Sequence, residues 1–169
     1  MGDMKSLLHC HHSLGLGHLV RTLRLADALL DLGPVCVICG GEVPAGFPIN
    51  PNIILKRLPP LNMATDGTLF NPISDVEPNQ VIEQRTILVQ RIVKDFLPDI
   101  VIVEMYPFGR KTFAREILAL LGRARRLQNV KVLSSVRDVF ITRRPDQHRH
   151  DRNAARCLNT HFDAVFSAV

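Results

Sequence analysis

The stretch HCHHSLGLGHLVRTLRLADALLDLG, residues 9–33, joins an apolar segment to a helical pattern through two closely spaced glycines. The residues SLLHCHH (6–12) predict a strand, and the apolar side chains of Leu19, Leu23, Ala26 and Leu30 share one face of a helix over 18–32. The Gly-Pro pair at 33–34 ends this helix. The sequence therefore predicts a strand, a glycine-containing turn and a helix, in that order.

The same alternation continues along the chain. Further strands are predicted at 35–39, 52–58, 99–104, 130–135 and 162–168, and helices at 77–96 and 110–126. A Pro- and Asn-rich loop extends to about residue 76, and a polar segment before the last strand fits another helix. The strands are near-continuous apolar runs, which is typical of strands buried on both faces. We predict an α/β fold: a single Rossmann-like domain over 1–169, with a doubly wound, mostly parallel sheet in three αβα layers.

The composition is that of an ordinary globular domain. Of the 169 residues, 46% are hydrophobic and 22% charged, which is enough apolar material for one packed core. No apolar run approaches the roughly 20 residues that a membrane-spanning helix needs, and MGDMKSLLHC lacks the features of a secretory signal. We therefore expect a cytoplasmic protein whose four cysteines are thiols rather than a disulfide framework.

Charge is unevenly distributed. Residues 1–104 carry a net charge of −3 and residues 105–169 one of +8. A basic half suits phosphorylated substrates, anionic lipid headgroups or nucleic acid. Only 5% of residues are aromatic and none interleaves the runs GRARR (122–126) and TRRPDQHRHDR (142–152), so no nucleic-acid partner is expected. The arginines form either a solvated helical face or a surface for an anionic partner.

A metal site is not expected, although histidines and cysteines crowd two strands. Neighbouring side chains of a strand point to opposite faces, so His9, Cys10, His11 and His12 cannot all converge. The pair Cys36 and Cys39 faces opposite ways for the same reason, whereas structural zinc needs four convergent ligands.

The first strand-to-helix turn is the main candidate site. In parallel sheets ligands bind beyond the carboxyl ends of the strands, and Gly15 and Gly17 permit positive φ and close approach of a ligand to the backbone. The third glycine of the dinucleotide fingerprint is replaced by Val20, and no acidic residue closes the second strand before Glu42. We therefore expect no nicotinamide or other cofactor. A tight turn without a ligand explains the glycines equally well.

Two side chains are candidate catalytic residues. His18 lies at the predicted helix start, where the helix dipole favours a neutral ring that can accept a proton. Glu104 ends the strand DIVIVE (99–104) at the same edge of the sheet, where a carboxylate could orient His18, accept a proton or hold a hydroxyl group. The alternatives are a capping or packing role for His18, and for Glu104 a helix cap or an ion pair with Arg110 or Arg137.

The stretch HSLGLGHLVRTLRLADALLDLG (12–33) resembles the first motif of glycosyltransferases of the B fold, in particular the family 28 branch that includes the lipid-linked N-acetylglucosaminyltransferase of peptidoglycan synthesis. The segments PDIVIVEMYPFGRKTFAREILALL (98–121) and SSVRDV (134–139) resemble a narrower group of predicted bacterial glycosyltransferases related to that branch. The first motif also resembles UDP-sugar hydrolases of nonulosonic acid synthesis. The resemblance covers nearly the whole chain.

The resemblance implies roles for particular residues. The turn that includes Ser13, Gly15, Leu16 and Gly17 would line the cleft near the donor diphosphate and the acceptor, and His18 matches the histidine proposed as general base.

Further candidates for substrate binding lie elsewhere at the expected ligand edge. Arg21 could reach a phosphate or pair with Asp27 or Glu104, and Arg110 and Arg137 could contact substrate. Asp138 is a second-tier candidate beside Arg137. Asp66 and Gly67 lie on the long loop that usually contacts the acceptor, although a plain turn is the simpler reading.

Enzymes of this architecture have a second Rossmann-like domain that binds the nucleotide sugar, and FDAVFSAV (162–169) ends where a first domain should end. We expect this chain to be the N-terminal, acceptor-side half of a two-domain B fold, inactive alone, belonging to an inverting enzyme that needs no metal. Its expected partners are a nucleotide-sugar donor and a hydroxyl acceptor. Three further possibilities are left open: a lipid-linked or phosphorylated acceptor, peripheral contact at the inner membrane face, and a homodimer. The alternatives are half of a UDP-sugar hydrolase, in which His18 activates water, or a noncatalytic binding or dimerisation domain.

Overall fold

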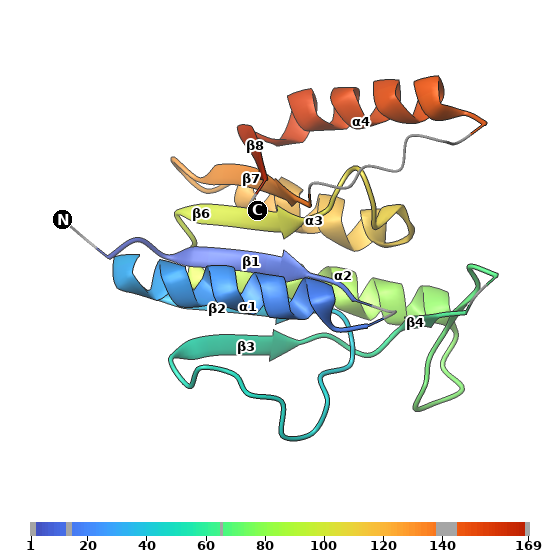
Figure 1. Ribbon diagram of the computed structural model, residues 1–169, viewed down its shortest axis with the longest axis horizontal. Coiled ribbons are helices and arrows are strands. Elements are labelled where there is room, and N and C mark those ends of the chain that lie inside the picture. Colours follow the sequence, from blue (N-terminus) through green and yellow to red (C-terminus); the bar gives the residue numbers. More distant parts are fainter. Residues whose placement is uncertain (1–2, 13–14, 65, 138–144, 168–169) are drawn as a thin grey trace.

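Six parallel strands form the main sheet of the computed structural model, which describes residues 3–12, 15–64, 66–137 and 145–167 (Figure 1). The strand order is β3-β2-β1-β6-β7-β8. The strands are β1 (Ser6–Cys10), β2 (Val35–Cys39), β3 (Ile53–Arg57), β6 (Ile100–Glu104), β7 (Lys131–Val136) and β8 (Ala164–Ser167). This is the doubly wound α/β arrangement that the alternation of patterns predicts.

Helices cover both faces of the sheet. The helix α1 (Gly17–Leu29), continued by the 3-10 turn η1 (Leu30–Leu32), lies on one face, and α2 (Pro78–Phe96) and α3 (Ala114–Ala124) lie on the other (Figure 1). The 3-10 turn η2 (Lys111–Phe113) precedes α3, and α4 (Gln147–His161) lies above β7 and β8 in this view. The three layers follow from two apolar clusters, one on each side of the sheet.

Successive residues of the central strands enter opposite clusters. Leu7 packs with α2 and α3, whereas Leu8 packs with α1, and both are fully or almost fully buried. The near-continuous apolar pattern of β1 and β2 is therefore explained by burial on both faces, as predicted. The edge strands β3 and β8 differ, because most of their side chains are partly or fully exposed.

Some predicted boundaries were wrong. The first strand ends at Cys10 rather than residue 12, and the last begins at Ala164 rather than residue 162. The long loop contains a small antiparallel hairpin of β4 (Asn62–Met63) and β5 (Leu69–Phe70). Hydrophobic periodicity could not predict this hairpin, because each strand has only two residues.

Helical spacing predicts that the apolar residues Val81, Leu88, Ile92 and Phe96 share the inward face of α2, and Val81 and Ile92 are buried there. Leu88 and Phe96 are only partly buried, whereas Arg85 is completely buried. The buried face of α2 is therefore centred on the line of Val81, Arg85 and Val89.

The sheet positions the candidate site at its topological switch point. β1 and β6 are neighbours in the sheet. The chain continues from β1 through α1 on one face of the sheet, and from β6 through α3 on the other face. In such folds a crevice forms beyond the carboxyl ends of those two strands. Glu104 is the last residue of β6 and is paired in register with Ser135 of β7.

Candidate functional site

His18 and Glu104 meet at the switch point. The Nδ1 atom of His18, the second residue of α1, lies 2.7 Å from Oε1 of Glu104 at the end of β6. The side chain of Glu104 is only 3% exposed, whereas that of His18 is 21% exposed. The carboxylate is thus buried beneath a histidine that reaches the surface.

The contact determines which ring nitrogen is free to accept a proton. An ionised carboxylate only accepts hydrogen bonds, so the Nδ1–H group of His18 is the donor, and in a neutral ring Nε2 then carries the lone pair. Nε2 has no hydrogen-bond partner among the described residues, and the side chain that carries it is 21% exposed. A carboxylate that orients a histidine in this way is the arrangement of a general base.

A second polar atom of the pair is unoccupied by protein. Oε2 of Glu104 is buried and has no hydrogen-bond partner within the described part of the chain. Glu104 lines a cavity of about 10 Å³ together with Arg21 and Ser135. Buried acceptors normally find a partner, so this oxygen marks Glu104 as more than a packing residue.

Arg21 joins α1 to the end of β7. Its Nη1 atom donates to Ser135 Oγ at 2.8 Å and its Nη2 atom to the Val136 carbonyl oxygen at 2.9 Å. Glu104 Oε1 is 3.9 Å from Nη1, a long ion-pair distance. The guanidinium is therefore occupied in holding β7 beside the His18–Glu104 pair.

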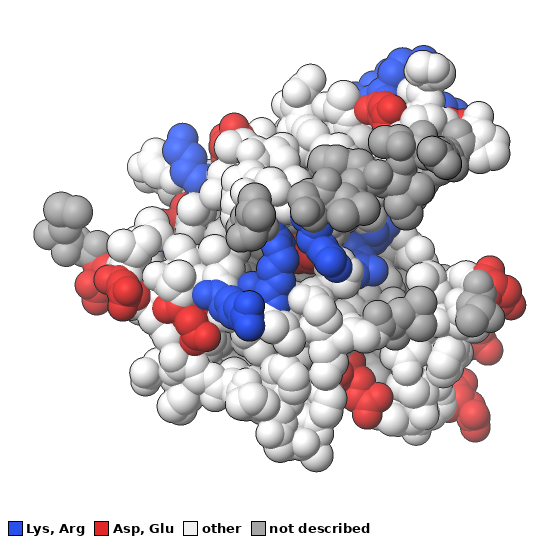
Figure 2. Space-filling model, in the orientation of Figure 1, with Lys and Arg blue, Asp and Glu red and all other residues white. Residues whose placement is uncertain are grey.

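Basic side chains gather beside the pair. A pocket of about 580 Å³ is lined by Gly17, Val20, Arg21, Arg24, Leu25, Ala28 and Arg137. Figure 2 shows Lys and Arg side chains along the hollow that separates the surface of α1 from the surface near α4. Arg24 and Arg137 are exposed, and neither side chain makes a hydrogen bond or ion pair to another described residue, so both are available to an anion.

The glycine turn divides into residues with different roles. Gly15 has φ of 89°, so it uses the left-handed region that glycine alone adopts without strain. Gly17 begins α1, and a Cβ atom there would meet nothing within 4 Å, so the backbone borders open space. Leu16 is the N-cap residue and supplies no side-chain cap, which leaves backbone N–H groups of the first turn without a side-chain partner. Ser13 lies outside the described residues, as does Asp138.

Three other predicted substrate-binding residues, Asp66, Gly67 and Arg110, make no hydrogen bond or ion pair with His18 or Glu104 in the described part of the chain. Asp66 accepts a hydrogen bond from the backbone N–H of Thr68 at 2.8 Å, which lowers the pKa of its carboxyl group, and Gly67 has φ of 88°. These two residues form the turn of the β4–β5 hairpin. Arg110 precedes η2 with φ of 61°, and its buried Nε has no partner in the described part of the chain.

A buried ionic network fixes the neighbouring strand ends on the opposite face of the sheet. Arg85 donates to Glu116 through Nε at 2.6 Å and Nη2 at 2.9 Å, and both side chains are completely buried. Glu116 also contacts His9 Nε2 at 3.0 Å. Burial alone raises the pKa of Glu116, but the His9 hydrogen bond and the Arg85 charge outweigh it, so the pKa is lowered.

The same arginine holds the segments that follow β1, β2 and β3. It donates to the carbonyl oxygens of Gly40 and Pro59, each at 3.2 Å, and lies 3.1 Å from His11 Nδ1. His11 stacks on Phe113 with ring centroids 3.5 Å apart. Burial, followed by the charge of Arg85, holds the pKa of His11 well below its ordinary value, so its ring is neutral.

Sequence reasoning missed Arg24, Ser135 and this network. Arg24 lies three residues after Arg21, so helical spacing could have placed both on one surface. Arg85 lies between the apolar residues Ile82 and Val89 at i−3 and i+4, and Glu116 directly precedes Ile117. Both charged residues therefore lie on the inward face of their helix. Two opposite charges on inward faces are the signal of a buried ion pair.

The cysteines near the site are free thiols. Burial raises the pKa of Cys10 to about 12 and that of Cys36 to about 11, which keeps both protonated at neutral pH. Within the described residues, no three His, Cys, Asp or Glu side chains are grouped so that they could hold a metal ion. In the same part of the chain, each helix is too short or too polar to cross a bilayer.

Known proteins share the fold at low sequence identity. The Bordetella bronchiseptica enzyme WbmH in complex with NAD+ matches 98% of this chain with a TM-score of 0.55 and 14% identity, and this chain spans 56% of WbmH. Phytolacca americana UGT2, solved with UDP-2fluoro-glucose and pterostilbene, matches 82% of this chain with a TM-score of 0.45 and 11% identity, and this chain spans 31% of it.

Phosphoglycerate kinase from Coxiella burnetii matches 95% of this chain with a TM-score of 0.46 and 12% identity, and this chain spans 46% of it. No protein-family model matches the sequence, and no curated protein sequence matches it. The chain thus spans about a third to a little over half of the solved structures it is similar to. The similarity to WbmH establishes a Rossmann-like α/β fold.

Proposed function

We propose that this chain is the acceptor-side domain of an inverting glycosyltransferase that moves a sugar from a nucleoside diphosphate sugar to an acceptor hydroxyl. The observation that carries the proposal is the 2.7 Å contact between His18 Nδ1 and Glu104 Oε1 at the switch point of the sheet. It leaves Nε2 without a partner among the described residues, at the edge of the sheet where ligands of this fold class bind. The glycine turn and the segments that resemble glycosyltransferases of the B fold add support.

The proposed step is a single displacement. His18 Nε2 takes the proton of the acceptor hydroxyl while the hydroxyl oxygen forms a bond to the anomeric carbon. The bond from that carbon to the diphosphate oxygen breaks, and the nucleoside diphosphate leaves with the electron pair. Attack from the face opposite the leaving group inverts the configuration. Glu104 accepts from Nδ1–H throughout and stabilises the imidazolium that forms.

The surroundings of the pair suit anionic reactants. Arg24 and Arg137 line the neighbouring pocket, and the first turn of α1 presents unpaired N–H groups at the positive end of the helix dipole. Such groups stabilise negative charge that develops on a leaving phosphate or is carried by a phosphorylated acceptor. In this mechanism a second Rossmann-like domain, acting with this one, recognises the donor nucleoside.

The test uses the full native protein and a panel of nucleoside diphosphate sugars. Release of nucleoside diphosphate is measured together with mass spectrometry of the sugar product. We expect His18→Ala to lower the rate by about 10²- to 10⁴-fold, the usual loss for a general base. His148→Ala is the matched control, because His148 is exposed on α4 and its side chain has no hydrogen-bond partner among the residues that the structure describes.

The sugar product distinguishes transfer from hydrolysis. A glycoside of inverted configuration supports the proposal. Free sugar formed at the same rate with and without acceptor contradicts it and favours the hydrolase, in which the same pair activates water. Equal rates for His18→Ala and the unaltered protein contradict a catalytic role for His18 in either reaction.

A further inference from the structure

Besides the pocket next to His18, a second group of basic residues lies between the C-terminal halves of α2 and α3. A groove of about 600 Å³ is lined by Gln90, Arg91, Lys94, Asp95, Ala119, Gly122, Arg123 and Arg126. Both helices run back from the carboxyl edge of the parallel sheet toward its amino edge, so their C-terminal ends lie at the opposite edge from the His18–Glu104 pair. Nothing in the proposed transfer reaction uses this groove.

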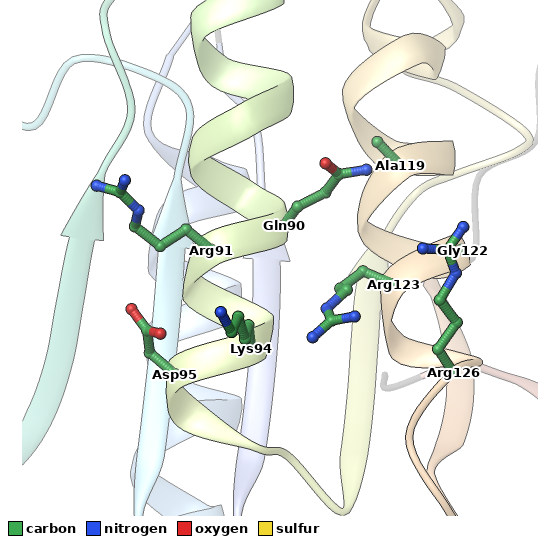
Figure 3. A pocket seen from close by; sticks show the side chains of 8 residues that line it. All are labelled: Gln90, Arg91, Lys94, Asp95, Ala119, Gly122, Arg123 and Arg126. Atoms are coloured by element: carbon green, nitrogen blue, oxygen red, sulfur yellow. The ribbon is translucent and has the colours of Figure 1, made fainter.

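Three cations line the groove between the two helices, namely Lys94, Arg123 and Arg126. Figure 3 shows Arg123 reaching from α3 toward α2, on the side where Lys94 lies, and Gln90 reaching from α2 toward α3. Arg126 follows the end of α3, and its side chain runs along that helix beside Gly122 rather than toward α2. Arg91 and Asp95 are directed to the other side of α2, so Asp95 is not placed to neutralise the α3 arginines.

These cations lack partners. In the described part of the chain, the side chains of Lys94, Arg123 and Arg126 make no hydrogen bond or ion pair. Arg125, from the same GRARR run, is by contrast paired with Asp163 at 3.0 Å and bonded to the His161 carbonyl oxygen at 2.9 Å. The run is therefore divided into one structural arginine and two that remain available to a ligand.

The arrangement costs free energy when it is empty. Arg123 and Arg126 are like charges three residues apart, and Lys94 lines the same groove from α2, so the cations repel one another. The negative ends of the two helix dipoles stabilise Lys94 and Arg123 only within the last turn of each helix. An anion with several negative charges removes the repulsion directly.

The shape of the groove selects the kind of anion. Its α3 wall carries the small residues Ala119 and Gly122, and a Cβ atom added at Gly122 would meet nothing within 4 Å. The two arginines offer planar forks that match phosphate oxygens, and Gln90 adds an amide donor. The lining includes no large apolar side chain, which a membrane-surface site needs for insertion.

We propose that the groove between α2 and α3 is a binding site for a soluble polyphosphate group, such as the di- or triphosphate of a nucleotide, held by Lys94, Arg123 and Arg126. The site is separate from the proposed catalytic pair and does not depend on it. A phosphate-bearing ligand bound there would act on the protein from the opposite edge of the sheet.

The test is a titration of the protein with inorganic tripolyphosphate, followed by amide NMR signals of Ala119 and Gly122 at constant ionic strength. We expect saturable shifts of both signals. The double variant Lys94→Ala/Arg123→Ala should weaken this binding at least tenfold, and Ala119→Glu, which places a carboxylate in the groove, should weaken it similarly. Thermal unfolding checks that each variant is folded.

Two control variants separate the site from general basic charge. Arg152→Ala/Arg156→Ala removes two charges from exposed positions of α4 and should leave the affinity unchanged. Arg24→Ala/Arg137→Ala alters the pocket beside His18 and should also leave the Gly122 shifts unchanged. Failure of the proposed transfer reaction would therefore not affect this result.

Three outcomes would overturn the proposal. The first is the absence of saturable shifts at Ala119 and Gly122. The second is an equal loss of affinity in Arg152→Ala/Arg156→Ala, which would reveal nonspecific charge attraction. The third is sedimentation with phosphatidylglycerol vesicles that requires Lys94 and Arg123 while tripolyphosphate leaves both signals unmoved, which would identify a lipid surface instead.

Discussion

The Nδ1 atom of His18 lies 2.7 Å from Oε1 of Glu104, although 86 residues separate them in the sequence. The contact joins the start of α1 to the last residue of β6. It exists because β1 and β6 are neighbours in the sheet, so the segments that follow them share one crevice. The predictions below test the pair, the residues that hold it in place and the buried network beside it.

Glu104→Gln should lower the turnover of the full native protein by roughly 10²-fold or more, with a much smaller effect on KM. The amide cannot stabilise the imidazolium, and it can present its NH₂ group to Nδ1, which favours the wrong tautomer of His18. Steady-state kinetics with the nucleotide sugar that the protein accepts provide the measurement. Unchanged turnover would mean that the carboxylate does not assist His18.

Arg21→Ala should destabilise the fold by about 2 kcal/mol, because a charged donor loses its hydrogen bonds to Ser135 and to the Val136 carbonyl oxygen. Arg24→Ala is the matched control on the same helix, since Arg24 is exposed, and its effect on stability should stay within about 0.5 kcal/mol. Urea unfolding of both variants gives the comparison. Equal stabilities would refute the structural role of Arg21.

Gly40→Ala should destabilise the protein by about 3 kcal/mol. A Cβ atom at Gly40 would overlap Arg85 Nη2 and His11 Nδ1, and both belong to the buried network. Gly122→Ala makes the same chemical change in open space within α3, where it should stabilise by about 0.5–1 kcal/mol. Thermal unfolding of the two variants should therefore move Tm in opposite directions, and shifts of the same sign would contradict this packing.

Stability should decrease as pH falls from 7 to 5, and His11 should be a main cause. Its pKa is well below 6.5 in the folded protein, whereas the unfolded chain binds a proton near pH 6.5. Below that pH the unfolded state gains a proton that the folded state lacks, so the free energy of unfolding falls by up to about 1.4 kcal/mol per pH unit. Glu116, whose folded pKa is lowered, adds a loss only below about pH 4.3.

The variant His11→Gln isolates this contribution. Its amide oxygen can still accept from Arg85, but the side chain does not titrate. Denaturant unfolding at pH 7, 6 and 5 should show a smaller pH slope for His11→Gln than for the unaltered protein. Identical slopes would contradict a neutral, buried His11.

The sequence patterns predicted most of the fold because its strands and helices are strongly periodic. The strand at 35–39 has the predicted bounds. The apolar residues that helical spacing predicts to be buried over 110–126 are all buried, namely Phe113, Ile117, Leu120, Leu121 and Ala124. In α1, Leu19, Leu23 and Ala26 are buried as predicted, whereas Leu30 is only partly buried in the 3-10 turn that follows. The hairpin at 62–70 escaped because turn chemistry rather than periodicity specifies it.

The site was predictable only in part, for a similar reason. His18 and Glu104 could be placed at one edge of a parallel sheet from strand ends alone. The partners of Arg21 could not, because Ser135 and Val136 reach it through the register of β6 with β7, which a single sequence does not specify. Arg85 was hidden because a periodicity argument expects apolar side chains on an inward face.

The most direct test of the central claim is the tautomer of His18, read from the ring ¹⁵N chemical shifts at pH 7.5. The account predicts a protonated Nδ1 and an unprotonated Nε2, with the preference lost or reversed in Glu104→Gln. A proton on Nε2 alone, or ring shifts that Glu104→Gln leaves unchanged, would contradict the pairing on which the proposed general base depends.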